Sequence, residues 1–257
     1  MNKKTNTSWG NVAPWYDGVV GDADSYQKKV IMPNLIRILD PKKGVTILEN
    51  ACGQGYFARA CASHGATVTG ADISNELIQL AKKHEDNKKD VVYHTAPADQ
   101  LTFAVSESYD AVLIVLALQN IENLLGTLVE SARVLKKGGR IVFVLNHPAF
   151  RIPGNSSWQW DEKEKKQYRR IDSYMSDAKN EIDMTPGEEN KYAKKFTYSF
   201  HRPLQSYVKA LSKAGFAITR LEEWISHKES QKGPRGEEEN RTRKEIPLFM
   251  CVEAVKL

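Results

Sequence analysis

The stretch Ile47-Leu48-Glu49-Asn50-Ala51-Cys52-Gly53-Gln54-Gly55 decides the fold of this chain. It joins an apolar, β-branched burst at 45–48 to an amphipathic stretch that begins near Tyr56, and so predicts a strand, a tight turn and a helix. Its alanine and glycines have little or no side chain, which lets the turn bring its backbone close to a ligand. The free N–H groups at the start of the following helix favour a carboxylate or a phosphate.

Outward from this loop, apolar bursts alternate with amphipathic stretches between residues 45 and 145, which predicts repeated strand–helix units and therefore a parallel sheet. Ala111–Ala117 is so uniformly apolar that we expect it to be the central strand, covered on both faces. The other expected strands lie at 45–48, 67–71, 91–94, 140–145, 217–225 and 247–257, and the expected helices lie at 30–39, from about 56, at 121–135 and at 204–211. Lys136-Lys137 and Gly138-Gly139 predict a basic last turn and a glycine stop for the third helix.

Two segments depart from this alternation of strand and helix patterns. Residues 150–200 are rich in charge and aromatic side chains and show no clean sheet periodicity, so we expect a cap inserted after the fifth strand. Residues 227–245 lack apolar side chains, so we expect an exposed, mobile connection between the last two strands. The chain is thus predicted to be one domain over 1–257, with an N-terminal lid or helical segment at 1–40 and the cap at 150–200.

Composition narrows the class of protein. The 257 residues carry 37 Lys and Arg against 32 Asp and Glu, a net charge of +5, which permits an anionic ligand without demanding nucleic acid. Three scattered cysteines, without a C-x-x-C pair, give neither a disulfide framework nor a zinc site, and we expect no metal. No signal-peptide pattern and no apolar run of about 20 residues is present. A reduced, cytoplasmic protein that does not bind membranes is expected.

Asp72 ends the second strand about 20 residues after the loop, where a carboxylate can accept both hydroxyls of a ribose. The loop also fits the dinucleotide fingerprint as Gly53-x-Gly55-x-x-Ala58, so the loop alone does not choose the cofactor.

From about Ala13 to Leu257 the chain resembles the class I S-adenosylmethionine-dependent methyltransferases, especially small bacterial enzymes that act on small molecules. The motifs that carry the resemblance are the ILENACGQG loop, Gly70-Ala71-Asp72-Ile73-Ser74, Ala96-Pro97-Ala98-Asp99, Tyr109-Asp110-Ala111-Val112, the segment 133–139 and Phe200-His201-Arg202-Pro203-Leu204. The usual first glycine of the loop is Ala51 here, and Asn50 replaces an apolar residue. The resemblance implies a Rossmann-like, doubly wound, seven-stranded and mostly parallel α/β sheet with an antiparallel last strand.

The resemblance also implies S-adenosylmethionine as cofactor and a role for individual residues. Glu49 and the loop backbone would hold the methionine part, Asp72 the ribose, and Asp99 the adenine amine. Ile73 would pack on the adenine, Leu116 would lie along the cofactor, and Tyr16 or Tyr26 would close over the methionine end. The cofactor-binding set is therefore Tyr16, Tyr26, Glu49, Asn50, Ala51, Gly53, Gly55, Asp72, Ile73, Ala98, Asp99 and Leu116.

The expected reaction is transfer of a methyl group to a small organic acceptor by in-line displacement, for which alignment and exclusion of water matter most. His147 follows the fifth strand and is a candidate general base, with a role in turning the chain before Pro148 as the alternative. The candidate acceptor-binding residues are Gln119, Asn120, His147, Trp158, Trp160, Tyr198 and His201.

Two other functions stay open at this point. One is a tRNA or rRNA methyltransferase, although the charges alternate in sign and form no basic stripe. The other is a catalytically silent subunit that binds the cofactor and supports a partner. We expect a small-molecule partner, no nucleic acid, and a monomer or homodimer; the acceptor and its nucleophilic atom do not follow from the sequence.

Overall fold

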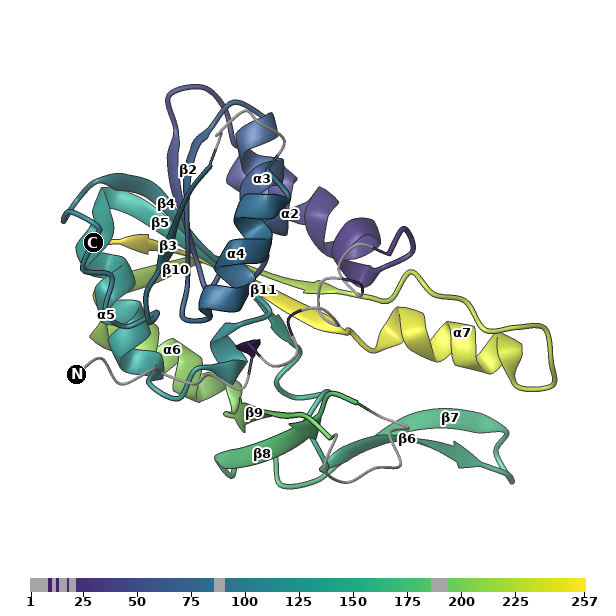
Figure 1. Cartoon of the computed structure of the whole chain (residues 1–257). Helices are drawn as coiled ribbons and strands as arrows, with labels where there is room; N and C mark the ends of the chain where they lie inside the picture. Colours follow the sequence, from purple (N-terminus) through teal and green to yellow (C-terminus); the bar gives the residue numbers. More distant parts are fainter. Residues whose placement is uncertain (1–8, 11–12, 14–17, 19–21, 86–90, 186–193) are drawn as a thin grey trace.

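One mixed sheet forms the centre of the molecule. The computed structural model describes residues 9–10, 13, 18, 22–85, 91–185 and 194–257. Seven strands pair in the order β10-β11-β5-β4-β1-β2-β3 (Figure 1). Their bounds are β1 (Thr46–Asn50), β2 (Thr67–Asp72), β3 (Val91–Thr95), β4 (Tyr109–Val115), β5 (Leu135–Asn146), β10 (Phe216–Trp224) and β11 (Phe249–Lys256). Only β11 runs antiparallel to its neighbours in this sheet, which confirms the predicted fold class.

The central position of β4 follows from its composition. Ala111, Leu113 and Val115 pack into the core on one face of the sheet, while Val112 and Ile114 pack into the core on the other. A strand with both faces buried needs apolar residues at every position instead of every second one. Burial of each such large side chain contributes about 1.5–3 kcal/mol, so β4 anchors both layers.

Helices cover both faces of the sheet and complete three layers (Figure 1). On one face lie α2 (Met32–Leu39), α3 (Tyr56–Ser63) and α4 (Asn75–Lys83), and on the other lie α5 (Leu124–Val134) and α6 (Leu204–Lys213). A π-helical turn, η2 (Gln27–Ile31), leads into α2, and a 3-10 turn, η3 (Leu118–Asn120), follows β4.

The junction between α5 and β5 differs from its prediction. The helix ends at Val134, and Leu135 already pairs with Tyr109 as the first residue of β5. The residues expected to form the last helical turn and its glycine stop therefore belong to the strand. Leu135 pairs with Tyr109 and Arg140 pairs with Ala111, so the strand pairing shifts register between them. Gly138 lies in this irregular stretch and adopts a φ of 74°. Lys136 donates to Asp110 Oδ1 at 2.7 Å and holds the irregular stretch against β4.

The segment between β5 and α6 forms two hairpins apart from the main sheet. The first pairs β6 (Ser156–Asp161) with β7 (Lys166–Ile171), and the second pairs β8 (Ala178–Asp183) with β9 (Phe196–His201). Most residues of β6 are partly buried whichever way they point. In β9 burial alternates, but the buried positions are Thr197, Ser199 and His201 while Phe196 and Tyr198 are exposed, so apolar character does not follow burial. This explains why the sequence shows no sheet periodicity here.

The connection expected at 227–245 is not irregular throughout, because α7 (Gly236–Glu245) occupies its second half. This helix has no apolar stripe and is supported by charges instead: Arg241 pairs with Glu238 at 2.7 Å, one turn apart. Its Glu238 also accepts a hydrogen bond from Gln167 N of β7 at 3.1 Å. A search for apolar spacing cannot detect a helix of this kind.

Within the ranges that the structure describes, no helix is long and apolar enough to cross a membrane.

The turn glycines of the sheet give a test of the loop geometry. Gly55 and Gly44 both have positive φ, 76° and 89°. A Cβ on Gly55 would collide with the Tyr93 ring, whereas a Cβ on Gly44 would meet nothing within 4 Å. We therefore expect Gly55→Ala to lower the free energy of unfolding by about 1–3 kcal/mol more than Gly44→Ala, the added cost of overpacking. Urea unfolding measures both, and equal losses would contradict the clash.

Candidate functional site

The loop between β1 and α3 turns sharply beneath the carboxyl edge of the sheet. Ala51 and Gly53 adopt left-handed backbone angles, with φ values of 61° and 55°. Cys52 N donates to Ala71 O at 2.9 Å, so the loop is fastened to the end of β2. The residue types that the loop needs are therefore those without bulk, as its sequence predicted.

Asp72 joins this loop to the segment that follows β2. Its Oδ2 accepts from Gly53 N at 2.9 Å and its Oδ1 accepts from Ser74 N at 2.8 Å. The side chain is almost fully buried, and burial raises its pKa while the two N–H donors lower it. A carboxylate can accept about four hydrogen bonds, so two acceptor positions stay free for the hydroxyls of a ligand.

Glu49 and Asn50 close β1 and lie wholly inside the protein. Asn50 Nδ2 donates to Ala98 O at 2.9 Å. Among the described residues, Asn50 Oδ1 and Glu49 Oε2 have no hydrogen-bond partner, which is costly for buried polar atoms. Burial raises the pKa of Glu49 to about 8, because the Ala58 N–H and the Arg59 charge offset only part of the desolvation.

A cavity of about 130 Å³ opens beside this loop. Of the predicted cofactor-binding residues it gathers Ala51, Gly53, Asp72, Ile73 and Leu116 in its wall. The wall does not include Glu49, Asn50, Gly55, Ala98 or Asp99. Trp9, Leu77 and Asn120, which the sequence interpretation did not assign to the cofactor, also contribute.

The Asp99 carboxylate is hydrogen-bonded to Asn123, the N-cap residue of α5. Asn123 Nδ2 donates to Asp99 Oδ2 at 2.6 Å, and Asn123 Oδ1 in turn accepts from Gly126 N at the start of α5. The carboxylate thus helps to hold the N-cap of α5. Contact with a ligand would need its other oxygen, Oδ1.

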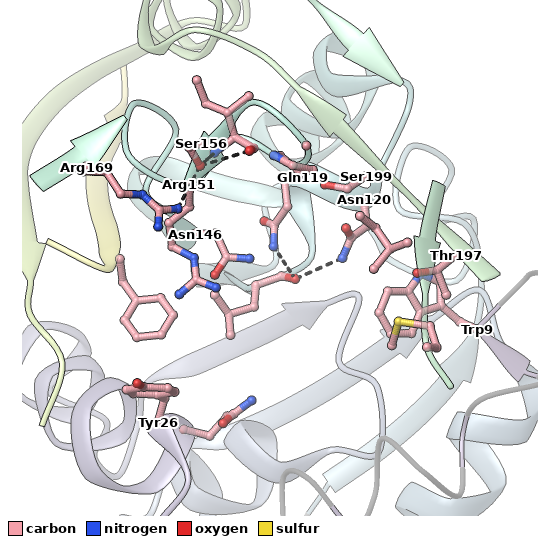
Figure 2. A pocket seen from close by; sticks show the side chains of 18 residues that line it. Trp9, Tyr26, Gln119, Asn120, Asn146, Arg151, Ser156, Arg169, Thr197 and Ser199 are labelled. Carbon is pink, nitrogen blue, oxygen red and sulfur yellow. Dashed lines mark hydrogen bonds between the residues drawn. The ribbon is translucent and has the colours of Figure 1, made fainter. Parts of the chain in front are cut away.

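A second cavity, of about 580 Å³, adjoins the first, and the two share Trp9, Leu116 and Asn120 in their walls. Figure 2 shows it from close by. Leu116 O accepts from Gln119 Nε2 at 2.8 Å and from Asn120 Nδ2 at 3.2 Å. Gln119 Oε1 is buried without a partner among the described residues. Gln119 and Asn120, two of the candidate acceptor-binding residues, both lie in the wall of this cavity.

Leu116 occupies the junction of the two cavities in a strained conformation. Its φ of 52° is rare for a residue with a side chain and costs about 1–2 kcal/mol. Leu116 N donates to Val144 O at 2.8 Å, which fixes the backbone to β5. Such strain persists at functional sites where the surroundings enforce it.

Tyr26 lines the larger cavity. Its hydroxyl lies 3.1 Å from Ser226 Oγ, and its ring meets Phe249 edge-on with centroids 5.6 Å apart. The other predicted closing aromatic, Tyr16, lies outside the described residues.

His147 lines neither of the adjoining cavities. Its Nδ1 accepts from Ala149 N at 3.2 Å, so the proton sits on Nε2, which donates to Glu223 Oε1 at 2.7 Å. Burial lowers its pKa, and Glu223 counteracts only part of that shift. Both ring nitrogens are engaged in holding the chain after β5, which matches the alternative role that the sequence left open.

The other predicted acceptor residues also lie off the larger cavity. Trp158 stacks under the Arg169 guanidinium, Trp160 under that of Arg235, and Tyr198 under the Lys179 ammonium. His201 Nε2 donates to Tyr174 O at 2.8 Å. The residues that do line the cavity and that the sequence interpretation missed include Asn146, Arg151, Ser156, Arg169, Thr197 and Ser199. Of these, only Asn146 had a sequence signal, since it ends a parallel strand.

Across the ranges described, no group of three or more His, Cys, Asp and Glu side chains is placed to hold a metal ion.

Comparison with known proteins bears on the glycine loop and the sheet. A family model described as "Methyltransferase domain" matches residues 48–143. A demethylmenaquinone methyltransferase of Tropheryma whipplei is 36% identical over 113 residues, which are 44% of this chain and 46% of that protein. A ubiquinone biosynthesis O-methyltransferase of Thiobacillus denitrificans is 31% identical over 117 residues, 44% of this chain and 50% of that protein. The chain spans about half the length of these curated relatives.

The similarity of fold reaches further along the chain. The crystal structure of an S-adenosylmethionine-dependent methyltransferase from Mesorhizobium loti aligns with a TM-score of 0.69 and 25% identity, covering 93% of this chain and 100% of that one. The family model covers only 48–143, which includes the glycine loop, whereas the structural alignment spans nearly the whole chain.

The buried carboxyl of Glu49 gives a pH-dependent prediction. Its pKa rises from an ordinary 4.5 to about 8 in the folded chain, so the folded state holds the proton more tightly. The free energy of unfolding should then fall as pH rises from about 4.5 to about 8, and Glu49→Gln should flatten that fall. Urea unfolding of both proteins at several pH values in this range measures the difference.

Glu222→Gln is the matched control. Hydrogen bonds from Arg37, above all, hold the pKa of Glu222 at about 2, so this carboxylate stays charged throughout the range. Its loss should leave the pH dependence unchanged above about pH 5.5, where Glu222 is ionised in the unfolded chain as well. Parallel curves for the native chain and Glu49→Gln would contradict the shifted pKa.

Proposed function

We propose that the chain is a class I S-adenosylmethionine-dependent methyltransferase and that it transfers the methyl group of that cofactor to a small organic acceptor. The observation that carries the proposal is the meeting of two cavities at Leu116 and Asn120. One has the glycine loop and Asp72 in its wall, and the other is large enough for a small molecule.

The chain's own residues fit the cofactor, S-adenosylmethionine. The two free acceptor positions of Asp72 suit ribose hydroxyls, and Ile73 offers an apolar surface for the adenine. The partnerless Asn50 Oδ1 suits a donor near the methionine end, and the Glu49 carboxyl, whose pKa of about 8 leaves it protonated in the chain without cofactor, would ionise beside the positive methionine ammonium. Asp99 keeps one oxygen for the adenine amine beside its bond to Asn123. Tyr26 would close over the methionine end from the larger cavity.

The chemistry that the cofactor supplies is a methyl group on a positively charged sulfur, which needs an aligned nucleophile more than an acid or a base. Of the described residues that line the larger cavity, none is a His, Asp or Glu. The walls therefore act by orienting the acceptor and excluding water. His147 has no part in this proposal, because both of its ring nitrogens are occupied elsewhere.

The two hairpins supply the far wall of the larger cavity, through Ser156, Arg169, Thr197 and Ser199. We therefore keep the segment 150–200 as a cap that selects the acceptor. The similarity to a demethylmenaquinone methyltransferase and to a ubiquinone biosynthesis O-methyltransferase supports a small-molecule acceptor here. The expected absence of nucleic acid, the monomeric or homodimeric state and the cytoplasmic location stay predictions.

Asp72→Ala tests the cofactor site. Losing the charge-assisted hydrogen bonds to the ribose should weaken binding of S-adenosylhomocysteine by about 1.5–3 kcal/mol, roughly tenfold to a hundredfold, in titration calorimetry. Asp161→Ala is the matched control, since Asp161 also accepts from two backbone N–H groups, those of Lys163 and Glu164, but in an exposed turn. Unchanged affinity in Asp72→Ala would place the ribose elsewhere.

A further inference from the structure

We propose that the acceptor carries an anionic oxygen group, a carboxylate or a phosphate, and that Arg151 and Arg169 bind it. This inference rests on the proposed function, because it names the substrate class of the same site. Its basis is the charge in the wall of the larger cavity. Among the described residues that line it, these two arginines are the only charged ones, and the rest are amides, hydroxyls and apolar side chains (Figure 2).

The guanidinium of Arg151 has no hydrogen-bond or ion-pair partner among the described residues. Every other arginine of the described chain donates a hydrogen bond or forms an ion pair, as Arg140 does with Glu253. The Arg151 guanidinium does neither with any described residue, while its backbone N is fixed to His147 O at 2.9 Å. Its five N–H donors therefore have no acceptor in the described chain, and the side chain forms part of the cavity wall.

Arg169 is held rigidly at the same wall. Its Nε donates to Phe150 O and its Nη2 to Ser156 Oγ, both at 2.8 Å, and its guanidinium carbon lies 5.1 Å from the centre of the Trp158 ring. Its Nη1 has no partner in the described chain. A guanidinium fixed in this way is pre-organised for an anion, since little side-chain freedom is left to lose.

The two charges act on one another. Arg151 is an exposed residue, yet the surrounding protein lowers its pKa, first by desolvation and then by repulsion from Arg169. No described acidic side chain lines the cavity to balance them. Two like charges in a partly enclosed space attract an anion, and a planar guanidinium suits the paired oxygens of a carboxylate or a phosphate.

The experiment uses the whole chain saturated with S-adenosylhomocysteine and three probes: benzoate, phenyl phosphate and the neutral benzamide. Calorimetry should show that benzoate or phenyl phosphate binds more tightly than benzamide, and the tighter of the two identifies carboxylate or phosphate as the source. Arg151→Gln should weaken the anionic probe at least about tenfold, or about 1.4 kcal/mol, and leave benzamide unchanged.

Arg170→Gln is the matched control. Arg170 neighbours Arg169 on β7 but pairs with Asp172 at the surface and lies outside the cavity wall, so probe binding should not change. Arg151 has no described partner, so its replacement should not disturb folding, which a thermal unfolding scan checks.

Three results would overturn the inference while the proposed function stands. The first is that no anionic probe binds the native chain loaded with S-adenosylhomocysteine, and the second is that Arg151→Gln binds the anionic probe as tightly as the native chain does. The third is that Arg151→Gln loses affinity for S-adenosylhomocysteine itself. The last would assign Arg151 to the carboxylate of the cofactor. Failure of the native chain to bind S-adenosylhomocysteine would instead reject the proposed function.

Discussion

The carboxylate of Asp72 is the constraint on which the site depends. By accepting from Gly53 N and Ser74 N, it ties the loop after β1 to the segment after β2. Those two strands are neighbours in a parallel sheet, so their carboxyl ends meet at one edge, where ligands of open α/β folds bind. The two N–H donors offset part of the desolvation of Asp72, although burial still raises its pKa, and the same burial strengthens its hold on a ligand.

The chemistry of the site divides between the two sides of Leu116. On the side of the glycine loop the partnerless atoms are acceptors, on Glu49 and Asn50, which suit a ligand rich in N–H and O–H donors. On the side of the hairpins the unused groups are the donors of Arg151, which suit an anion, and the acceptor Gln119 Oε1, which suits an N–H or O–H group of the same ligand. The side of the hairpins thus differs from the side of the glycine loop in the positive charge of its wall.

Several features of the site could be predicted from the sequence because they are local. A buried strand, a tight loop and an acidic residue at the end of the next strand are each visible in a few neighbouring residues. Gln119 and Asn120 could be predicted because they follow the fourth strand, and ligands of open α/β folds bind at the carboxyl ends of the strands. Trp158, Trp160 and Tyr198 were chosen for their aromatic character, but cations of neighbouring strands and loops cover their rings. α7 was missed because charge pairs support it instead of an apolar stripe.

The sequence by itself determined the sheet, the place of the glycine loop and the position of Asp72, because periodicity and turn chemistry act over short distances along the chain. Only the tertiary structure decided which side chains face the larger cavity. Arg169 reaches it because β7 pairs with β6 and its guanidinium is fixed to Phe150 O, while the bond to Glu223 turns His147 away. The Arg169–Phe150 contact joins residues 19 positions apart, and the His147–Glu223 contact joins residues 76 positions apart. A local sequence pattern does not specify contacts between residues so far apart in the chain.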